Sequence, residues 1–138
     1  MDIKQALEKY PGASVFDFGD SKELSDKLLG LVRSGRKTAT CASLREYQIE
    51  GEKLPEIGRR DIAVNYLDRT PALVIETVEV TQRRFCDVDE RFALAEGENN
   101  DLAGWRRDHQ AYFERNGGFD VEMILVCERF KLVEDFQQ

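Results

Sequence analysis

Apolar residues recur at helical spacing in two stretches of the chain. The first stretch predicts a helix that starts near the capping pair Asp20 and Glu23 and ends at Gly35. The second predicts a helix that starts after Asp101 and stops at Gly117. The positions on the two helical stripes are Leu24, Leu28, Leu31 and Val32, and then Leu102, Trp105, His109, Tyr112 and Phe113.

Alternating apolar and polar residues predict strands between these helices. In the fourth strand, Val74, Val78 and Val80 should share one face. Two short helices are also expected, one that ends near residue 10 and one that Asp87 or Asp89 caps and that runs to residue 95. The expected strands cover residues 15–18, 38–41, 61–67, 72–84 and 123–133. Strands outnumber helices in this pattern, which favours an α+β fold with mixed strand order.

Residues 46–58 interrupt the regular pattern. They are polar and contain Gly51, Pro55 and Gly58, so we expect a long connection rather than a packed helix or strand. Connections of this length often carry function. Tyr47 belongs to this segment and has no obvious packing role, which makes it a candidate for stacking on a planar ligand.

Length and composition limit the possible classes of protein. A chain of 138 residues suits one domain with a single core, so residues 1–138 are expected to form one domain. No apolar run approaches the roughly 20 residues of a membrane span, and the amino terminus carries no apolar signal segment. We therefore expect a cytoplasmic protein.

The cysteine and histidine counts argue against two kinds of stabilising site. Three cysteines without a close pair do not suggest a disulfide framework. One histidine and no Cys-x-x-Cys pair leave too few ligands for a nitrogen- or sulfur-rich metal site, although carboxylates and water could hold a loosely bound magnesium ion. No cofactor is expected.

The net charge of −7 disfavours long-range attraction to polynucleotides. Basic residues are nevertheless clustered, in Arg33, Arg36 and Lys37 and in the doublets Arg59-Arg60, Arg83-Arg84 and Arg106-Arg107. Doublets of this kind are usually solvated surface charge. They would support RNA binding only if Arg36, Lys37 and one of the later arginines border a common groove.

The turn from Gly35 to Thr40 is the strongest chemical signature in the chain. Its sequence is Gly-Arg-Lys-Thr-Ala-Thr, placed where a helix passes into a strand. Lys37 and Thr40 could converge on a pocket as base and nucleophile, or they could be a helix-capping lysine and a β-branched strand residue. Their spacing in an extended strand puts them on opposite faces unless the turn or a bulge redirects one of them.

Five blocks in a fixed order resemble the ASCH family, in its bacterial single-domain branch. The resemblance runs from about residue 15 to residue 133. The blocks are Phe18-Gly19-Asp20, Gly35-Arg36-Lys37-Thr38-Ala39-Thr40, Ala95-Glu96-Gly97-Glu98, Trp105-Arg106-Arg107-Asp108-His109 and Val126-Cys127-Glu128-Arg129-Phe130. The resemblance implies a PUA-like mixed β-barrel flanked by helices, with a cleft beside the lysine-threonine turn.

Several activities are compatible with this resemblance. Some bacterial members are amidohydrolases that remove the acetyl group of N4-acetylcytidine, one branch cleaves RNA, and others are presumed RNA binders. Matched to the amidohydrolases, the catalytic residues here would be Lys37, Thr40 and Glu98. Glu96 lies two residues away and competes with Glu98 for this assignment. Amide hydrolysis needs a nucleophile, a base and an acid or cation, and no metal is required.

Further residues are candidates for binding a substrate. Arg36 and Thr38 flank Lys37 in the turn, and Tyr47 or Trp105 could stack on a base. His109 suits proton transfer in RNA cleavage, although its place beside an apolar stripe also fits a structural histidine. The expected partner is a modified pyrimidine nucleoside, with single-stranded RNA as the alternative, either cleaved by a ribonuclease or held by a non-catalytic binding module.

Overall fold

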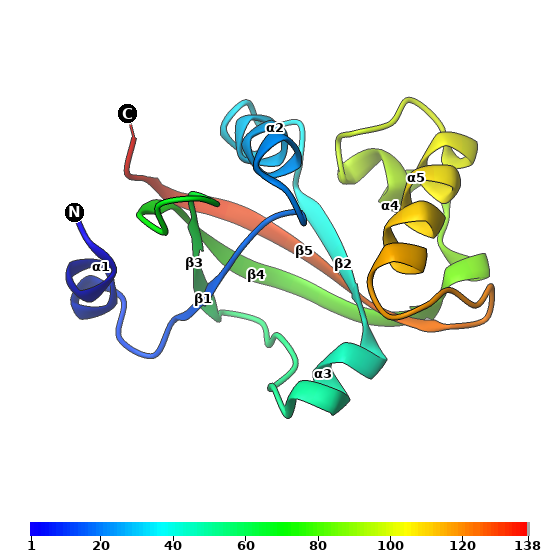
Figure 1. The fold of residues 1–138 in the computed structure, drawn as a ribbon, viewed down its shortest axis with the longest axis horizontal. Coiled ribbons are helices and arrows are strands. Elements are labelled where there is room, and N and C mark those ends of the chain that lie inside the picture. The colour runs from blue at the N-terminus through cyan, green and yellow to red at the C-terminus, as the bar shows by residue number, and fades with distance from the viewer. Residues whose placement is uncertain (138) are drawn as a thin grey trace.

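A mixed sheet that curls into half a barrel forms the framework of the protein (Figure 1). The structure is a computed structural model that describes residues 1–137. Its strands are β1 (Ser14–Phe16), β2 (Ala39–Ser43), β3 (Arg60–Val64), β4 (Pro71–Arg84) and β5 (Ile124–Asp135). They lie in the order β1-β3-β4-β5-β2, and only the β1–β3 pair is parallel. The predicted α+β fold, a mixed β-barrel flanked by helices, is confirmed, with the barrel present as a sheet curled into half a barrel.

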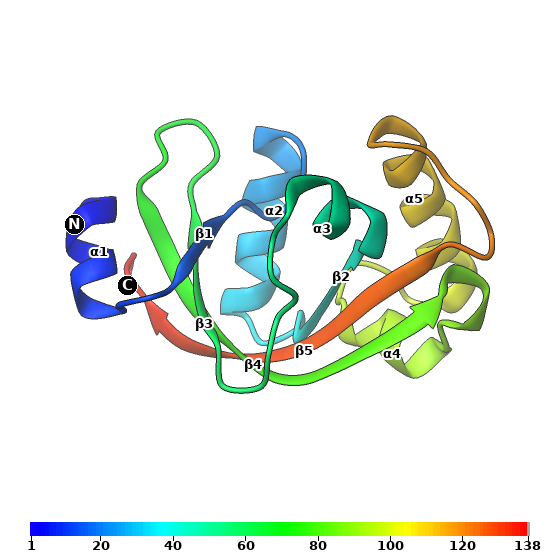
Figure 2. The same ribbon diagram turned by 90° about the horizontal axis from the view of Figure 1, so that it is seen from below.

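Helices surround this sheet on several sides. They are α1 (Ile3–Lys9), α2 (Lys22–Arg33), α3 (Leu44–Glu50), α4 (Glu90–Ala95) and α5 (Leu102–Arg115), with a single 3₁₀ turn at Phe85–Asp87. Figure 2 shows α2 and α3 within the curve of the long strands, α1 at one end of the sheet and α4 with α5 at the other. Among residues 1–137, no helix is both long and apolar enough to cross a membrane.

Three groups of buried apolar residues attach the helices to the sheet. Leu28, Leu29 and Val32 of α2 pack with Phe18 and Phe130 on the concave face. Another group joins α4 and α5 to β2 and β5, and its members include Ala39, Phe92, Trp105, Phe113 and Leu125. The smallest group holds α1 against β3 and β4. The cleft described below lies between the first two groups, because α2 and α5 cover separate parts of the sheet.

Strand β4 contains an irregularity in its pairing with β5. The register with β5 shifts between Thr77 and Glu79, which leaves Val78 unpaired and 44 % exposed. A bulge of this kind adds one residue to one strand and so reverses which face the following side chains occupy. The prediction that Val74, Val78 and Val80 share one face is therefore wrong. Val74 packs on α1, whereas Val80 lies opposite Glu128.

Two predictions about helix boundaries also need correction. The segment at residues 46–58 is not wholly irregular, because it begins inside α3 and Gly51 ends that helix in the left-handed conformation. The cap of α2 is Ser21, whose hydroxyl accepts from the Leu24 amide, and not Asp20. Asp20 instead accepts hydrogen bonds from Asn116 at the end of α5. Of the two expected caps for α4, Asp87 and Asp89, the structure shows Asp89, and α5 starts after Asp101 as predicted.

Two helix ends meet at the start of β2. Gly35 follows the end of α2 with φ of 82°, and Gly97 follows the end of α4 with φ of 84°. The amides of Arg36 and Lys37 donate to the Leu31 carbonyl, and the Thr38 amide donates to the Ala95 carbonyl. A Cβ atom on Gly97 would lie 2.7 Å from the Arg36 carbonyl oxygen. Only glycine allows the two turns to approach this closely.

We predict that Gly97→Ala destabilises the protein much more than Gly35→Ala. Both residues have nearly the same positive φ, which costs an alanine about 1 kcal/mol. A Cβ on Gly35 would meet no atom within 4 Å, so Gly35→Ala measures the backbone cost alone. In Gly97→Ala, the clash with the Arg36 carbonyl should increase the loss of unfolding free energy by about 1–3 kcal/mol. Urea unfolding of both variants measures the difference, and equal losses would show that the close approach is not needed.

Candidate functional site

Lys37 is a buried cation at the meeting point of the two helix ends. Its side chain is only 1 % exposed. The ammonium donates to the Ala39 carbonyl at 2.9 Å, and it lies 3.3 Å from Glu96 Oε1 and 3.4 Å from the Glu96 carbonyl. The ring of Phe18 lies below it, 5.7 Å from Nζ. The negative ends of the dipoles of α2 and α4 both favour a positive charge at this position.

Glu96 is the partner that neutralises Lys37. Besides the ammonium, its carboxylate accepts from the Trp105 indole at 2.8 Å and lies 3.4 Å from His109 Nε2. Burial by itself would raise the pKa of Glu96, but the charges of Lys37 and His109 and the hydrogen bonds lower it to about 2. The carboxylate therefore stays ionised, and it fixes three side chains at once.

His109 completes this cluster from α5. Its Nδ1 lies 2.9 Å from the Trp105 carbonyl, and its ring stacks on the Trp105 indole with centroids 4.2 Å apart. Burial opposes a charge on the ring, but Glu96 raises the pKa of His109. Trp105 itself is completely buried, so the prediction that it stacks on a substrate base is wrong. Its apolar stripe position, rather than a binding role, explains its location.

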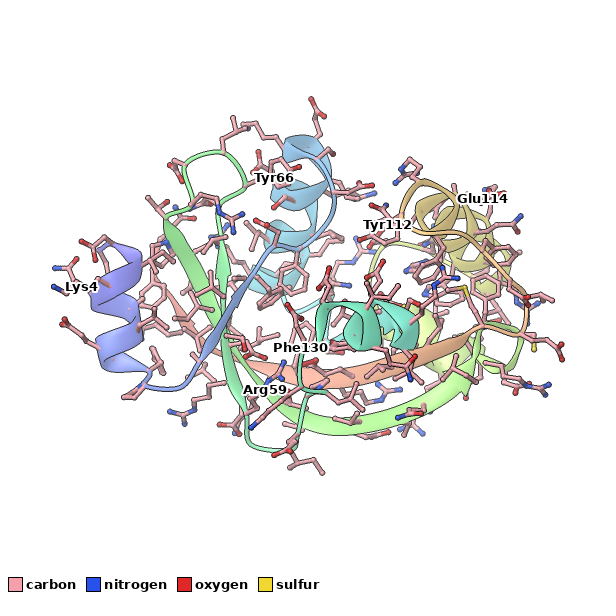
Figure 3. All side chains as sticks on the ribbon, turned by 60° about the horizontal axis from the view of Figure 1, so that its bottom comes forward. Lys4, Arg59, Tyr66, Tyr112, Glu114 and Phe130 are labelled. Carbon is pink, nitrogen blue, oxygen red and sulfur yellow. The ribbon has the colours of Figure 1, made fainter. Side chains whose placement is uncertain are left out.

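A cleft of about 1130 Å³ opens between α2, α3 and α5 over the concave face of the sheet. Figure 3 looks onto α3, with Arg59 and Tyr112 on either side of it, and both residues line the cleft. The predicted site residues on the cleft wall are Lys37, Thr40, Glu98, Tyr47 and His109. The structure thus brings Lys37 and Thr40 to one cavity. Lys37 precedes β2, so the alternation of side chains along the strand does not place it on the face opposite Thr40.

Arg36 and Thr38 are not part of the cleft lining among the described residues. Both are exposed, and the Thr38 hydroxyl contacts the Ala95 carbonyl at 3.5 Å. Glu98 is half-buried on the wall, whereas Glu96 is the carboxylate in contact with Lys37. The two glutamates therefore take different positions, one beneath the site and one facing the cavity.

The floor of the cleft carries a second buried polar group. Glu128 is 7 % exposed and accepts from the Thr77 hydroxyl at 3.0 Å. Asp61 is 3 % exposed and pairs with Arg59 at 2.9 Å. Burial raises the pKa of Glu128, and the neighbouring Asp61 raises it further against the lowering effect of the Thr77 hydrogen bond and Arg59. Sequence reasoning did not assign a role to these floor residues.

The charge of the cleft is predominantly negative. Its lining includes ten residues with carboxyl side chains but five lysines or arginines. Of the predicted basic residues, Lys37 and Arg59 border it and both are paired with carboxylates. Arg36, Arg83 and Arg106 do not belong to the lining, so the arginine groove that RNA binding would require is not formed there.

One grouping within residues 1–137 has the composition of a metal site. Ligand atoms of Cys41, Glu96 and His109 all lie within 4.8 Å of one another. The carboxylate in this group is already engaged by Lys37 and Trp105. Burial and the charge of Glu96 raise the pKa of Cys41 well above its usual range, which opposes the thiolate that a metal would need. The residues present therefore suit the observed ion pair better than a metal.

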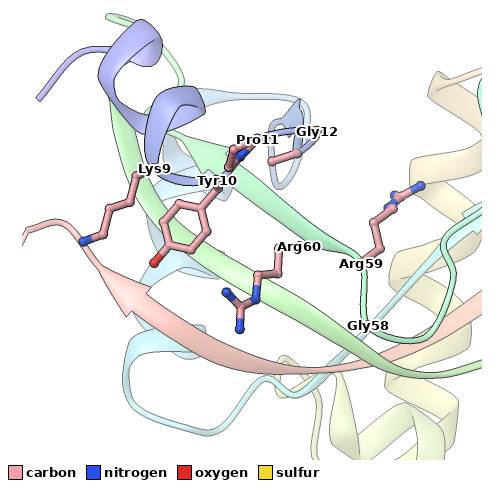
Figure 4. Close-up of a pocket in the computed structure, with 8 residues that line it drawn as sticks. Lys9, Tyr10, Pro11, Gly12, Gly58, Arg59 and Arg60 are labelled. Atoms are coloured by element: carbon pink, nitrogen blue, oxygen red, sulfur yellow. The ribbon is translucent and has the colours of Figure 1, made fainter.

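A smaller pocket of about 310 Å³ lies beside α1 (Figure 4). Three basic residues line it, Lys9, Arg59 and Arg60. Each of them is paired with a carboxylate, since Lys9 contacts Glu134, Arg59 contacts Asp61 and Arg60 contacts Glu76. The pocket therefore offers little uncompensated charge to an anion.

The curled sheet with a cleft beside the lysine-threonine turn defines a known class of α+β domain. In a structure from Enterococcus faecalis V583, described as a DUF984 family protein, 35% of residues are identical, with a TM-score of 0.85 over 97% of this chain and 86% of that one. An ASCH domain from Lactobacillus crispatus JV V101 gives 30% identity and a TM-score of 0.80 over 94% and 84% of the two chains.

The ASCH domain family model matches residues 14–134. The chain therefore belongs to the ASCH domain family, which is associated with RNA. A search among curated proteins found no match.

The sequence indicates only weakly that Glu128 and Asp61 belong to the floor of the cleft. Glu128 alternates with Val126 and Phe130, so an acidic residue falls on an otherwise apolar face of the last strand. Asp61 similarly begins a run that is buried throughout. A charge at such a position indicates either an exposed edge or a buried polar site, and the sequence alone does not distinguish the two.

We predict that protonation of Glu96 lowers the free energy of unfolding at acidic pH. Its pKa of about 2 lies below its ordinary value of 4.5, so the unfolded chain binds this proton more readily than the folded protein does. The contribution of Glu96 is fully present above pH 4.5 and is lost as the pH falls towards 2. Denaturant unfolding at several pH values should give a shallower acid dependence for Glu96→Gln.

The Glu96→Gln variant should also be less stable at neutral pH, by about 3 kcal/mol, because Lys37 is left buried without its counter-charge. Glu98→Gln serves as the control, since Glu98 has no hydrogen-bonded ion pair with Lys37 in the described structure. Equal acid slopes for wild type and Glu96→Gln would contradict the assignment of the charged cluster to Glu96.

Proposed function

We propose that the protein is a hydrolase that removes an acyl group from the exocyclic amide of a modified cytidine such as N4-acetylcytidine. The observation that carries this proposal is the shared cleft of Lys37, Thr40 and Glu98. The three side chains come from the turn before β2, from the second residue of β2 and from the segment after α4. A hydroxyl, a cation and a carboxylate in one cavity are the groups that amide hydrolysis needs.

Thr40 is the nucleophile in the proposed reaction. Its Oγ forms a bond to the acyl carbon, the bond from that carbon to N4 breaks, and N4 takes up a proton and leaves as cytidine. Water then cleaves the Thr40 ester, which releases the carboxylic acid and restores the hydroxyl. The hydroxyl must lose a proton as it attacks, and the leaving nitrogen must gain one.

The ion pair with Glu96 refines the roles expected from the sequence. Because Lys37 lies 3.3 Å from the Glu96 carboxylate as an ion pair, we assign it the role of the cation beside the developing oxyanion rather than that of the base first expected. Glu98 faces the cavity and is then the group that takes the proton from Thr40 and returns it to the leaving nitrogen. His109 acts through Glu96 and positions Lys37 indirectly.

The charge of the cleft favours a nucleoside over a polynucleotide. A nucleoside carries no phosphate, whereas each phosphate of an RNA strand would face an excess of carboxylates in the lining. Tyr47 lines the same cavity, and burial raises its pKa to about 12, so the ring stays neutral and available for stacking.

We predict that Thr40→Ala abolishes hydrolysis of N4-acetylcytidine while the protein remains folded. Removing the nucleophile should lower kcat by about 10³-fold or more. Thr38→Ala is the matched control, because Thr38 is an exposed threonine two residues away and outside the cleft lining. Release of cytidine, followed by chromatography, gives the rates. Parental turnover by folded Thr40→Ala would show that another group, such as a water activated in the cleft, attacks the acyl carbon.

The RNA alternatives give different results with the same variants. A ribonuclease that uses His109 would survive Thr40→Ala and lose activity in His109→Ala. A non-catalytic RNA-binding module would bind single-stranded RNA with an affinity that falls steeply with salt and would leave N4-acetylcytidine intact. Either result would overturn the proposed hydrolase.

A further inference from the structure

Glu128 is a buried carboxyl group that the proposed reaction leaves without a role. It lies in the cleft lining on β5, 7 % exposed, directly opposite Thr40 across the β2–β5 pair. Directly opposed residues on one face of an antiparallel pair have Cβ atoms about 5 Å apart. The Glu128 carboxyl group is therefore a neighbour of the proposed nucleophile.

The groups around Glu128 favour its neutral form. Asp61 faces it from β3, Tyr47 from α3, Thr77 from β4 and Arg59 from the segment before β3. Arg59 is engaged by Asp61 at 2.9 Å, and Glu128 forms no ion pair of its own within residues 1–137. Burial and Asp61 raise its pKa, although Thr77 and Arg59 act in the opposite direction. A carboxyl in these surroundings can hold its proton and donate a hydrogen bond.

The Thr77 hydroxyl orients this proton. It donates to Glu128 Oε2 at 3.0 Å, so Oε2 acts as the carbonyl oxygen and the proton belongs on Oε1. The acid form then presents a donor beside an acceptor, separated by the width of one carboxyl group. Such a pair is complementary to a ring nitrogen that accepts and an adjacent exocyclic N–H that donates.

We propose that Glu128 in its acid form binds the N3/N4 edge of a cytosine base, with Oε1–H donating to N3 and Oε2 accepting from the N4–H group. This inference rests on the proposed function and specifies how that site would select its base. N3 and the N4–H are the acceptor and donor of cytosine that remain when N4 carries one acyl group. In this arrangement the acyl carbon, bonded to N4, lies within reach of the Thr40 hydroxyl on the opposite strand.

The test compares binding of cytidine and 3-deazacytidine, in which a C–H replaces N3. The wild-type protein should prefer cytidine by about tenfold, because the analogue leaves the buried Glu128 donor unsatisfied. Glu128→Met keeps the length of the side chain and should lose the preference. Glu128→Gln should retain it, because the amide also presents an acceptor and a donor. Calorimetry with the folded proteins gives the affinities.

A pH series separates recognition from a structural role. The wild-type preference should fall as the pH rises through the raised pKa of Glu128, whereas that of Glu128→Gln should stay constant. A preference that survives in Glu128→Met, a loss of preference in Glu128→Gln, or no binding of either nucleoside would overturn the inference.

Binding and turnover are measured independently in this design. A protein that prefers cytidine through Glu128 but does not hydrolyse N4-acetylcytidine would contradict the proposed hydrolase and leave the base recognition supported. A protein that hydrolyses N4-acetylcytidine with unchanged cytidine preference in Glu128→Met would contradict only the role of Glu128.

Discussion

The buried ion pair between Lys37 and Glu96 is the constraint on which the rest of the site depends. Two charges out of water are stable only when further hydrogen bonds satisfy them, and here those bonds come from three parts of the chain. The carbonyls of Ala39 and Glu96 satisfy the ammonium, while α5 supplies Trp105 and His109 to the carboxylate. The pair therefore fixes the start of β2 against the end of α4 and the inner face of α5.

This arrangement gives the cleft two separate polar groups in addition to Thr40. One group is the charged cluster around Lys37, and the other is the carboxyl pair of Asp61 and Glu128. The first suits a developing negative oxygen, and the second suits the polar edge of an uncharged base. In the proposed reaction, this separation would let an acidic protein act on a nucleoside without attracting polynucleotides.

Much of the framework could be predicted from the sequence, because the long elements have clear periodicity and caps. Helix α5, strand β5 and the glycine-ended α2 all follow from local rules. The bulge at Val78 could not be predicted, since it depends on pairing between distant strands. The turn sequence identified Lys37 and Thr40, but it did not separate the positions of Glu96 and Glu98. Their difference arises from the left-handed Gly97, which turns the chain between them.

The bulge at Val78 has a consequence for how this sheet can change in evolution. Beyond it, the face of each β4 residue is set by the number of residues before it, because the register with β5 shifts there. Loss of Val78 itself would remove the bulge and leave the pairs of Glu79 and Val80 with β5 in place, whereas loss of a paired residue would disturb the alternation of those that follow. The outer part of β4 should therefore tolerate wide drift in composition and even loss of the bulged residue, but not loss of a paired one.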